Sequence, residues 1–336
     1  MVSALTAYLW VPDNSENANQ MHLSIHSMPP GFKVNILTIP VTTENTQTWG
    51  SLFLNGKKNQ EQAIPIHSYE IKEDTLITYA YQRDGSKGLY KAYTVENFKT
   101  VAHVNEIPPK YITKRTFLLG TDKYGRDLLS RLIVGMRVSL SIGFIAVSIS
   151  LFIGIFFGAI SGYFGGRVDA VIMWIINVTW SIPTLLLVIA ITLALGKGFW
   201  QVFIAVGLTM WVEVARVIRG QILSVKEMQY VTAARALGFS HFRIIVKHIL
   251  PNCMAPVIVI AAANFAAAIL IESGLSFLGI GAQPPTPSWG GIIKNHYHYI
   301  IMGKPYLSLI PGVALMLVVA AFMLMSNAIR DAFSER

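Results

Sequence analysis

Long uncharged stretches dominate the chain from Val138 onward. Each is long enough to cross roughly 30 Å of hydrocarbon as a helix, which takes about 20 residues. A lipid-exposed backbone must satisfy its own hydrogen bonds, so these stretches are expected to be helical. A shorter run, Gly198–Val212, reaches spanning length if it continues through Glu213 to Ile218. The pattern therefore predicts five complete transmembrane helices, the other four being Val138–Gly166, Ala170–Gly196, Ile249–Ile271 and Pro305–Ile329.

Residues 12–117 have a different pattern. Short apolar runs of strand type are separated by turn-forming pairs such as Asn55-Gly56 and Asp84-Gly85. They predict a small β-rich insertion without a catalytic constellation. Its histidines, His22, His26, His67 and His103, have no metal-like spacing. The predicted strands are Phe32–Ile39, Thr48–Leu54, Ala63–Ile71, Thr75–Tyr81 and Leu89–Val95.

Composition supports immersion in lipid. Of 336 residues, 53% are hydrophobic and 13% charged, whereas soluble domains carry roughly 25% charged residues. The net charge of +9 could suggest nucleic acid, but no nucleic-acid-binding module is evident. Basic residues beside apolar spans more simply meet anionic lipid headgroups. The single cysteine, Cys253, excludes an intramolecular disulfide.

Polar and small residues inside the predicted helices indicate packing and possible function. Gly154, Gly158 and Gly162 recur every fourth position, which allows helices to approach closely. Glu272 lies in an otherwise apolar segment, where an ionisable group can line a transport path or pair with another helix. Alternatively, it sits hydrated near the external interface. Glu213 is expected at a membrane interface, beside Arg216.

The loop 216–251, between the third and fourth predicted helices, carries six Lys or Arg, and residues 110–137 carry seven. The positive-inside rule therefore leaves the orientation open. Within the loop, Val225–Leu237 has good helix formers, and Gly238 follows where a helix end favours φ > 0. Ser240 is a suitable N-cap for a second helix, and Pro251 would end or kink it. Such a loop, rather than being a solvated connection, is expected to engage a partner outside the bilayer.

The same loop carries a family motif. Ala233-Ala234, Gly238 and Leu250-Pro251 match EAA-x3-G-x9-I-x-L-P, with Thr232 in place of the motif's Glu and His248 in place of its Ile. The chain resembles permeases of binding-protein-dependent ABC transporters, in the dipeptide/oligopeptide/nickel branch and of the DppC/OppC-like type. The resemblance covers about residues 118–333. Further matching blocks are Leu119–Asp127, Gly162–Gly166, Leu275–Gly279 and Gln283–Trp289.

The resemblance implies an architecture. Residues 118–336 would form an all-α permease domain with coupling helices at about 221–251, which sit in a groove of a cytoplasmic ATP-binding subunit. Residues 12–117 would then be extracytoplasmic, and residues 1–11 the remnant of a truncated first span. The implied ATPase-coupling residues are Glu227, Ala233, Ala234, Gly238, Leu250 and Pro251. The implied external interfacial motif, followed by an amphipathic helix at Leu128–Arg137, is Gly120, Thr121, Asp122, Gly125, Arg126 and Asp127, whose charges are expected to fix structure.

The resemblance also implies a function. The chain would be a non-catalytic subunit of an ATP-driven importer in the bacterial inner membrane, forming half of the translocation path. Its partners would be a second permease subunit in a heterodimer, two cytoplasmic ATP-binding subunits and an extracytoplasmic substrate-binding protein. The chain has no G-x-x-x-x-G-K-[ST] signature, so ATP would be bound by partners and no cofactor or metal by this chain.

Alternatives remain at this stage. Di- or oligopeptides are the expected cargo, and nickel or another small solute is the alternative. A stand-alone secondary transporter or channel would need polar relays inside several helices, yet four of the five predicted spans contain no charged residue. A membrane-bound enzyme would need convergent His, Asp, Ser or Cys groups, and only scattered single residues are present.

Overall fold

The computed structural model describes residues 6–40, 48–58, 61–98, 101–196 and 198–334, and the chain divides into two compact units. The predicted remnant of a first span lies partly outside the described residues, and its described part contains a short helix, α2 (Ala7–Trp10). The first unit comprises Met1–Arg137, Pro284–Ser288 and Asn295–Pro311; the second comprises Val138–Gln283, Trp289–Lys294 and Gly312–Arg336.

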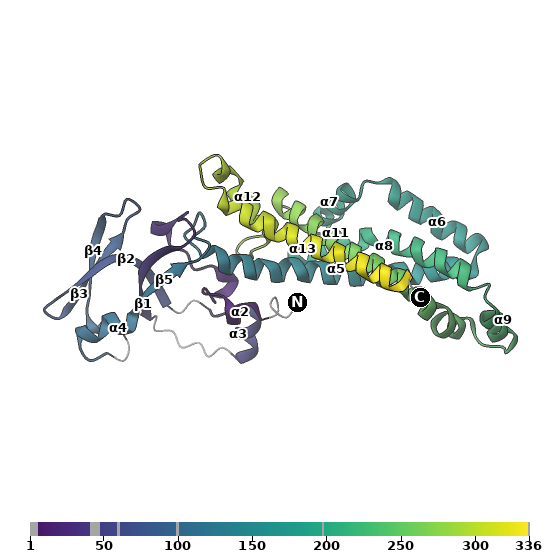
Figure 1. Ribbon diagram of the computed structural model, residues 1–336, viewed down its shortest axis with the longest axis horizontal. Coiled ribbons are helices and arrows are strands. Elements are labelled where there is room, and N and C mark those ends of the chain that lie inside the picture. The colour runs from purple at the N-terminus through teal and green to yellow at the C-terminus, as the bar shows by residue number, and fades with distance from the viewer. Residues whose placement is uncertain (1–5, 41–47, 59–60, 99–100, 197, 335–336) are drawn as a thin grey trace. The chain divides into compact units, whose positions relative to one another are not determined.

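A five-stranded antiparallel sheet forms the centre of the first unit, in the order β4-β3-β2-β1-β5 (Figure 1). Leu37, Ile66 and Leu76 are buried and pack with Phe98 and Ile107 in one core cluster. The strands are β1 (Phe32–Pro40), β2 (Glu61–Lys72), β3 (Thr75–Tyr81), β4 (Lys87–Tyr93) and β5 (Ile112–Phe117). Short helices complete the unit: η1 (Glu16–Ala18), η2 (Leu23–Ile25), η3 (Val95–Asn97), η4 (Val104–Glu106), α4 (Ile107–Tyr111) and η6 (Tyr297–Ile300).

The sequence predicts four of these strands and is wrong about a fifth. Thr48–Leu54, expected to be a strand, is instead part of helix α3 (Trp49–Asn55). Thr48 has the extended backbone of an N-cap residue, and Gly56, with φ +78°, ends the helix in a conformation that favours glycine. The strand that the pattern does not reveal is β5, which pairs with β1 across many intervening residues.

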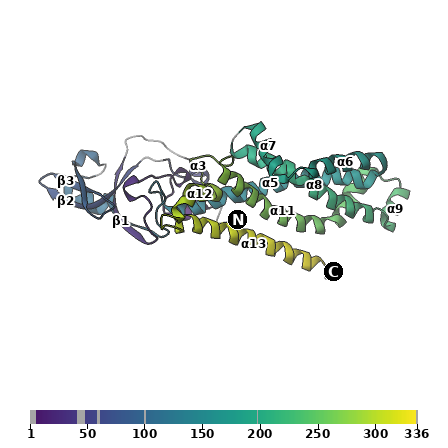
Figure 2. The same ribbon diagram turned by 90° about the horizontal axis from the view of Figure 1, so that it is seen from above.

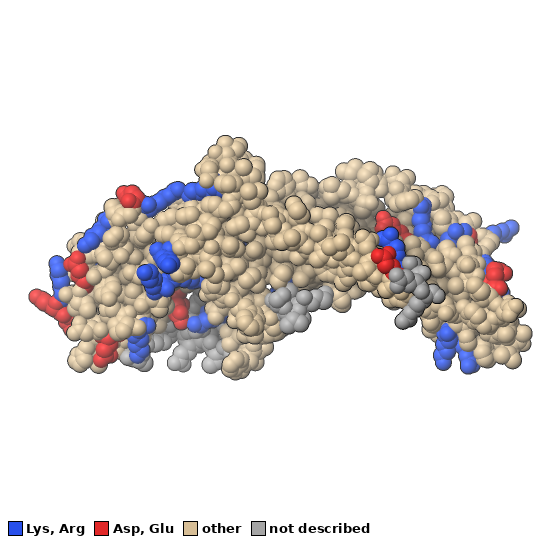
Figure 3. Space-filling model, in the orientation of Figure 1, with Lys and Arg blue, Asp and Glu red and all other residues tan. Residues whose placement is uncertain are grey.

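Four helices among the described residues are long and apolar enough to cross a membrane. The predicted amphipathic helix Leu128–Arg137 is the beginning of one of them rather than a separate element. Figure 3 shows a face along one of the four, α13, that carries almost no charged side chains. The four are α5 (Leu128–Phe164), α8 (Phe199–Val225), a continuous helix of α10 (His241–Arg243), η5 (Ile244–Ile249) and α11 (Leu250–Leu278), and α13 (Tyr306–Ser334).

The prediction of five complete spans is corrected at Ala170–Gly196. This stretch contains the greater part of two helices, α6 (Gly166–Ser181) and α7 (Thr184–Leu195), which are bent by 93° at the break between them. Pro183 lies in that break. Because proline lacks an N–H and pushes the preceding residue to extended angles, Ile182 leaves the helix at φ −91°, ψ 129°. The described chain thus has four candidate spans, or five if the bent pair is one.

Glycines bring α5 and α8 into close contact within the second unit. A Cβ atom at Gly154, Gly158 or Gly162 would lie within 3.0 Å of a carbonyl oxygen of α8. The predicted close packing is therefore confirmed, and it involves both the backbone and the side chains of α8. Helix α8 also packs against α6, α7 and α11 (Figure 2), and a shorter helix, α12 (Trp289–His296), follows α11.

Candidate functional site

The motif-bearing loop begins with a turn. Helix α8 ends at Val225, residues 226–228 form the turn, and α9 runs from Gln229 to Ala236. The predicted helix Val225–Leu237 is therefore shorter than expected at its start. Met228 occupies the N-cap position with extended backbone angles. Glu227 lies in the turn, exposed to solvent.

Gly238 ends α9 in the manner predicted. Its φ of +74° is in the left-handed region, its N–H donates to the Arg235 carbonyl at 3.0 Å, and the Phe239 N–H donates to the Ala234 carbonyl at 3.2 Å. These two bonds form a Schellman motif. A Cβ at Gly238 would meet no atom within 4 Å. The need for glycine here comes from the backbone angle alone.

The second helix begins at Ser240, which acts as the predicted N-cap by accepting from the Arg243 N–H at 3.4 Å. The helix then continues through a π-helical turn, Ile244–Ile249, into α11. Of the two expected effects of Pro251, ending or kinking the helix, the first therefore does not occur. Because Pro251 stands in the first turn of α11, directly after the π turn, its missing N–H is tolerated.

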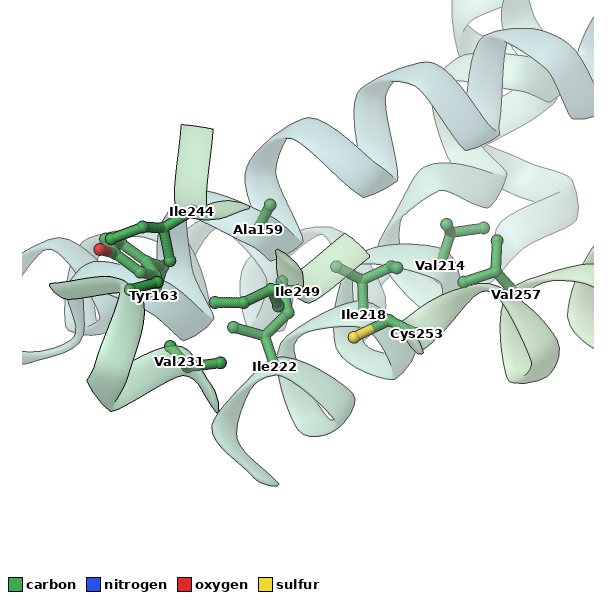
Figure 4. Packing of buried hydrophobic residues seen from close by; sticks show 11 residues of the cluster. Ala159, Tyr163, Val214, Ile218, Ile222, Val231, Ile244, Ile249, Cys253 and Val257 are labelled. Carbon is green, nitrogen blue, oxygen red and sulfur yellow. The ribbon is translucent and has the colours of Figure 1, made fainter. Parts of the chain in front are cut away.

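A buried apolar cluster joins these helices to the membrane spans (Figure 4). Val231 and Ala234 of α9 and Ile244 and Ile249 of η5 are all buried in it. The two motif alanines have different surroundings, since Ala234 is buried and Ala233 is exposed. The remaining buried members, from α5, α8 and α11, are Ala159, Tyr163, Val214, Ile218, Ile222, Cys253 and Val257.

Polar contacts add to the cluster at the end of α5. The Tyr163 hydroxyl lies 2.8 Å from Nδ1 of His241, and the Arg235 guanidinium stacks on the Tyr163 ring at 5.5 Å. Lys226 Nζ donates to the Gly162 carbonyl at 3.3 Å. Residues before, within and after α9 therefore all contact the last turn of α5.

A bidentate ion pair joins α6 to α8. The Arg219 guanidinium donates through Nε and an Nη atom to the two carboxylate oxygens of Asp169, each at 2.6 Å, and the Ser161 hydroxyl also donates to Asp169. This geometry is the strongest form of such a pair. Sequence reasoning misses the pair. The available signal was a pair of opposite charges, Asp169 and Arg219, that flank apolar runs on the same predicted side of the membrane.

Comparison with known proteins identifies the family. The family model for the inner membrane component of binding-protein-dependent transport systems matches residues 150–336. The chain belongs to this family. It is a permease of the ABC transporter type, DppC/OppC-like, and a multi-pass membrane protein.

Individual relatives belong to the same type of permease. The permease is 41% identical over 231 residues to the di/tripeptide transport system permease protein DppC of Pseudomonas aeruginosa, covering 68% of this chain and 76% of the relative. It is 36% identical over 217 residues to the oligopeptide transport system permease protein OppC of Bacillus subtilis, covering 65% and 71%. A chain of the MetNI methionine ABC transporter, solved in inward-facing conformations, has a TM-score of 0.51 at 18% identity, covering 61% of this chain and 97% of that one, which shows a shared fold.

The outer surface of the permease's motif loop is apolar with basic groups. Met228, Tyr230, Leu237 and Phe242 have 44–76% of their surface exposed. Arg235, Arg243 and Lys247 are exposed beside them. A surface of this kind fits a protein groove better than water. Leu250 is half-buried, and Pro251 is exposed on α11.

The predicted external motif, by contrast, is buried in the first unit. The Asp122 carboxylate pairs with Arg126 at 2.6 Å and accepts from the backbone N–H groups of Tyr124 and Arg126. Thr121 is also fully buried, and its hydroxyl bonds the Ile25 carbonyl. A Cβ at Gly120 or Gly125 would lie 2.3 or 1.8 Å from a carbonyl oxygen of residues 22–28. These contacts hold residues 118–127 against residues 19–28.

Asp127 completes this motif at the start of α5. Its Oδ2 accepts from the Ser130 N–H at 2.8 Å and from the Ser130 hydroxyl. It thus caps the helix whose first residue is Leu128. Burial raises the pKa of Asp127, although both bonds from Ser130 oppose this effect. The arrangement agrees with charges that fix structure.

Glu272 lies inside the second unit with no exposed surface. Ser276 donates to its carboxylate at 2.6 Å and Ser139 of α5 at 3.1 Å. The carboxylate therefore faces α5, and contact with cargo would require these helices to part. That Glu272 lines a path stays a prediction.

Proposed function

We propose that this permease is one membrane subunit of an ATP-driven importer of di- or oligopeptides in the bacterial inner membrane. The observation that carries the proposal is the helix pair after Gln229, which is packed onto three spans and carries the family's motif. Relatives whose names specify peptide transport support the cargo. The chain would form half of the translocation path, and a second permease subunit would form the other half.

The geometry supports a mechanical role for residues 216–251. Of two cytoplasmic ATP-binding subunits, which bind the ATP, one would receive the exposed apolar surface of α9 and α10. Their closure would displace α9 as a rigid piece because the Schellman motif at Gly238 fixes the angle between the helices. The displacement would pass to α5 through Tyr163 and His241, and directly to α11, which continues the second helix.

Residues 12–117 would then lie on the extracytoplasmic side, where a substrate-binding protein delivers cargo. The assignment follows from topology. If residues 216–251 meet the ATPase in the cytoplasm, the other end of α8 and the start of α5 face the opposite side. The buried Asp122–Arg126 pair would serve to anchor this unit to α5.

The proposal is tested by reconstitution. The complete transporter, co-expressed with its second permease and ATPases, is placed in proteoliposomes with its binding protein and ATP. Uptake of labelled di-, tri- and pentapeptides and of Ni²⁺ is then measured. Uptake of peptides that requires ATP and binding protein is expected. Uptake of Ni²⁺ without any peptide would reject the proposed cargo, and uptake without the ATPases would reject the coupling role.

A further inference from the structure

A pocket lined by both apolar and polar side chains lies in the second unit, at the bend between α6 and α7. It has a volume of about 190 Å³ and is bordered by α6, α7, α8 and α11. Trp180, Ile182 and Thr184, from either side of the helix break, line it. Glu213 and Asn264 contribute its carboxylate and amide. Broken helices at membrane depth are tolerated where they line a cavity, so the break and the pocket fit together.

Glu213 lies near the middle of α8. It is residue 15 of the 27 in this helix, about 20 Å from either end at a rise of about 1.5 Å per residue. Among the described residues no hydrogen bond or ion pair engages its carboxylate. Arg216, the expected neighbour, instead stacks on the Trp180 ring at 3.6 Å and donates to Asn177 at 2.7 Å. Arg216 therefore does not pair with Glu213, and the expectation that Glu213 lies at a membrane interface stays a prediction.

Asn264 of α11 is 97% buried, with 3% of its surface exposed, and its side-chain nitrogen has no hydrogen-bond partner in the described chain. Leaving such a donor unsatisfied costs about 1–3 kcal/mol. The threonine hydroxyls that line the pocket do not accept a hydrogen bond from this nitrogen. Thr179 donates to Ile175 and Thr209 donates to Val206, each within its own helix. The pocket thus holds one unused donor and one unused anionic acceptor.

These two groups limit what can face the pocket. Lipid is a poor neighbour, because hydrocarbon offers no partner to a carboxylate or to an unpaired amide donor. A lysine or arginine from the second permease would satisfy Glu213, but it has no acceptor for Asn264. A group with an ammonium and a carbonyl close together satisfies both. The amino-terminal residue of a peptide has this arrangement.

We propose that the pocket at Glu213 and Asn264 binds the amino-terminal residue of a peptide in transit. The Glu213 carboxylate accepts from the α-ammonium group, and the Asn264 amide donates to the first peptide carbonyl. The volume is below the roughly 300 Å³ of a full ligand site. It therefore holds one end of the cargo. This inference rests on the proposed function.

The test uses the reconstituted transporter with dialanine as cargo. The variants are Glu213→Gln, which removes the charge at constant shape, Glu213→Asp, which keeps it, and Asn264→Leu. Glu96→Gln, at an exposed carboxylate of the first unit, is the matched control. Three quantities are measured: the maximal uptake rate, the ATPase rate stimulated by the loaded binding protein, and the ratio of the two permease subunits in the purified complex.

Glu213→Gln is expected to lower maximal dialanine uptake by about tenfold (about 1.4 kcal/mol) while ATPase stimulation and subunit ratio stay at wild-type values. Glu213→Asp should restore most uptake, Asn264→Leu should lower it, and Glu96→Gln should not. Wild-type uptake by Glu213→Gln overturns the subsite. Loss of the second permease subunit from this variant also overturns it and identifies an interfacial ion pair. If the wild-type transporter carries no peptide, the proposed function fails first; if it carries peptide and the variants match it, only the subsite fails.

Discussion

A close contact between helices α5 and α8 of the permease domain gives a quantitative prediction. At Gly158 of α5, an added Cβ would lie 2.6 Å from the carbonyl oxygen of Ala215 and 2.9 Å from Cγ2 of Ile218. Ordinary contacts begin at 3.4 Å, so the first of these is short by about 0.8 Å. The obstructing atom belongs to the backbone of α8. Relief therefore requires the two helices to move apart rather than a side chain to rotate.

The cost of Gly158→Ala follows from two opposing effects. Overpacking of this kind costs about 1–3 kcal/mol, and replacing a helical glycine by alanine returns about 1 kcal/mol of helix propensity. Gly220→Ala on α8 isolates the second effect, because Gly220 is exposed and its added Cβ would meet nothing within 4 Å. The difference between the two variants is therefore the packing cost, about 2 kcal/mol at the centre of the range.

Thermal unfolding of the purified permease complex in detergent measures this difference. For a unit of this size, about 1 kcal/mol corresponds to roughly 2–4 °C in Tm, so Gly158→Ala should unfold roughly 4–8 °C below Gly220→Ala. Gly220→Ala itself should equal or exceed the wild type. Equal Tm values for the two variants would refute the close approach of α5 and α8, since both share the propensity gain and differ only in what the new methyl group meets.

Two further predictions concern other parts of the chain. Asparagine tolerates positive φ, so Gly238→Asn should keep ATP-driven uptake near the wild-type rate. Gly238→Val should lower uptake at least about tenfold while membrane insertion stays normal. If Gly238→Asn lowers uptake as much as Gly238→Val does, the cause is a clash with the ATPase groove and not the backbone angle. Burial and the Arg115 charge lower the pKa of His22 from 6.5 to about 4, so the folded first unit resists protonation and loses stability as the pH falls from 6.5 toward 4, by about 2 kcal/mol at pH 5. The drop in Tm between pH 7 and pH 5 should shrink in His22→Gln, and an unchanged drop would show that other groups control it.

Hydropathy predicts which segments enter the membrane but not how each one crosses it. An apolar composition favours burial in lipid, and a backbone in lipid must form its own hydrogen bonds. For this reason, every predicted span is helical in the structure. The prolines show what hydropathy does not predict, namely whether a helix continues or bends. Pro251, Pro256 and Pro311 lie inside continuous helices, whereas Pro183 accompanies a bend of 93°. The residue is the same in each case, and only the neighbouring helices decide whether the freed backbone groups can be satisfied in a straight or a bent chain.

In the candidate coupling site too, features set by neighbouring residues in the sequence can be predicted, and contacts between residues far apart cannot. Gly238 and Ser240 act as predicted because helix capping depends on a few consecutive residues. The contacts of the site with the spans join residues far apart, such as Tyr163 and His241, and no spacing rule indicates them. For the same reason, the sequence does not indicate that Asn264 is a candidate binding residue. An amide in an alanine-rich helix becomes unusual only when its burial and its missing partner are known.

The helices around the coupling helices are joined to them, directly or through α8, by interactions of very different stiffness. Helix α11 continues η5 covalently through hydrogen-bonded backbone, so it must follow any tilt of the second coupling helix. Helix α5 is joined by side chains at its last turn, and α6 is joined to α8 by the Asp169–Arg219 pair and an apolar side-chain cluster. Side-chain joints can pivot where a continuous helix cannot. A motion delivered at α9 should therefore reach the pocket wall formed by Asn264 on α11 first, and the wall formed by the α6–α7 bend last.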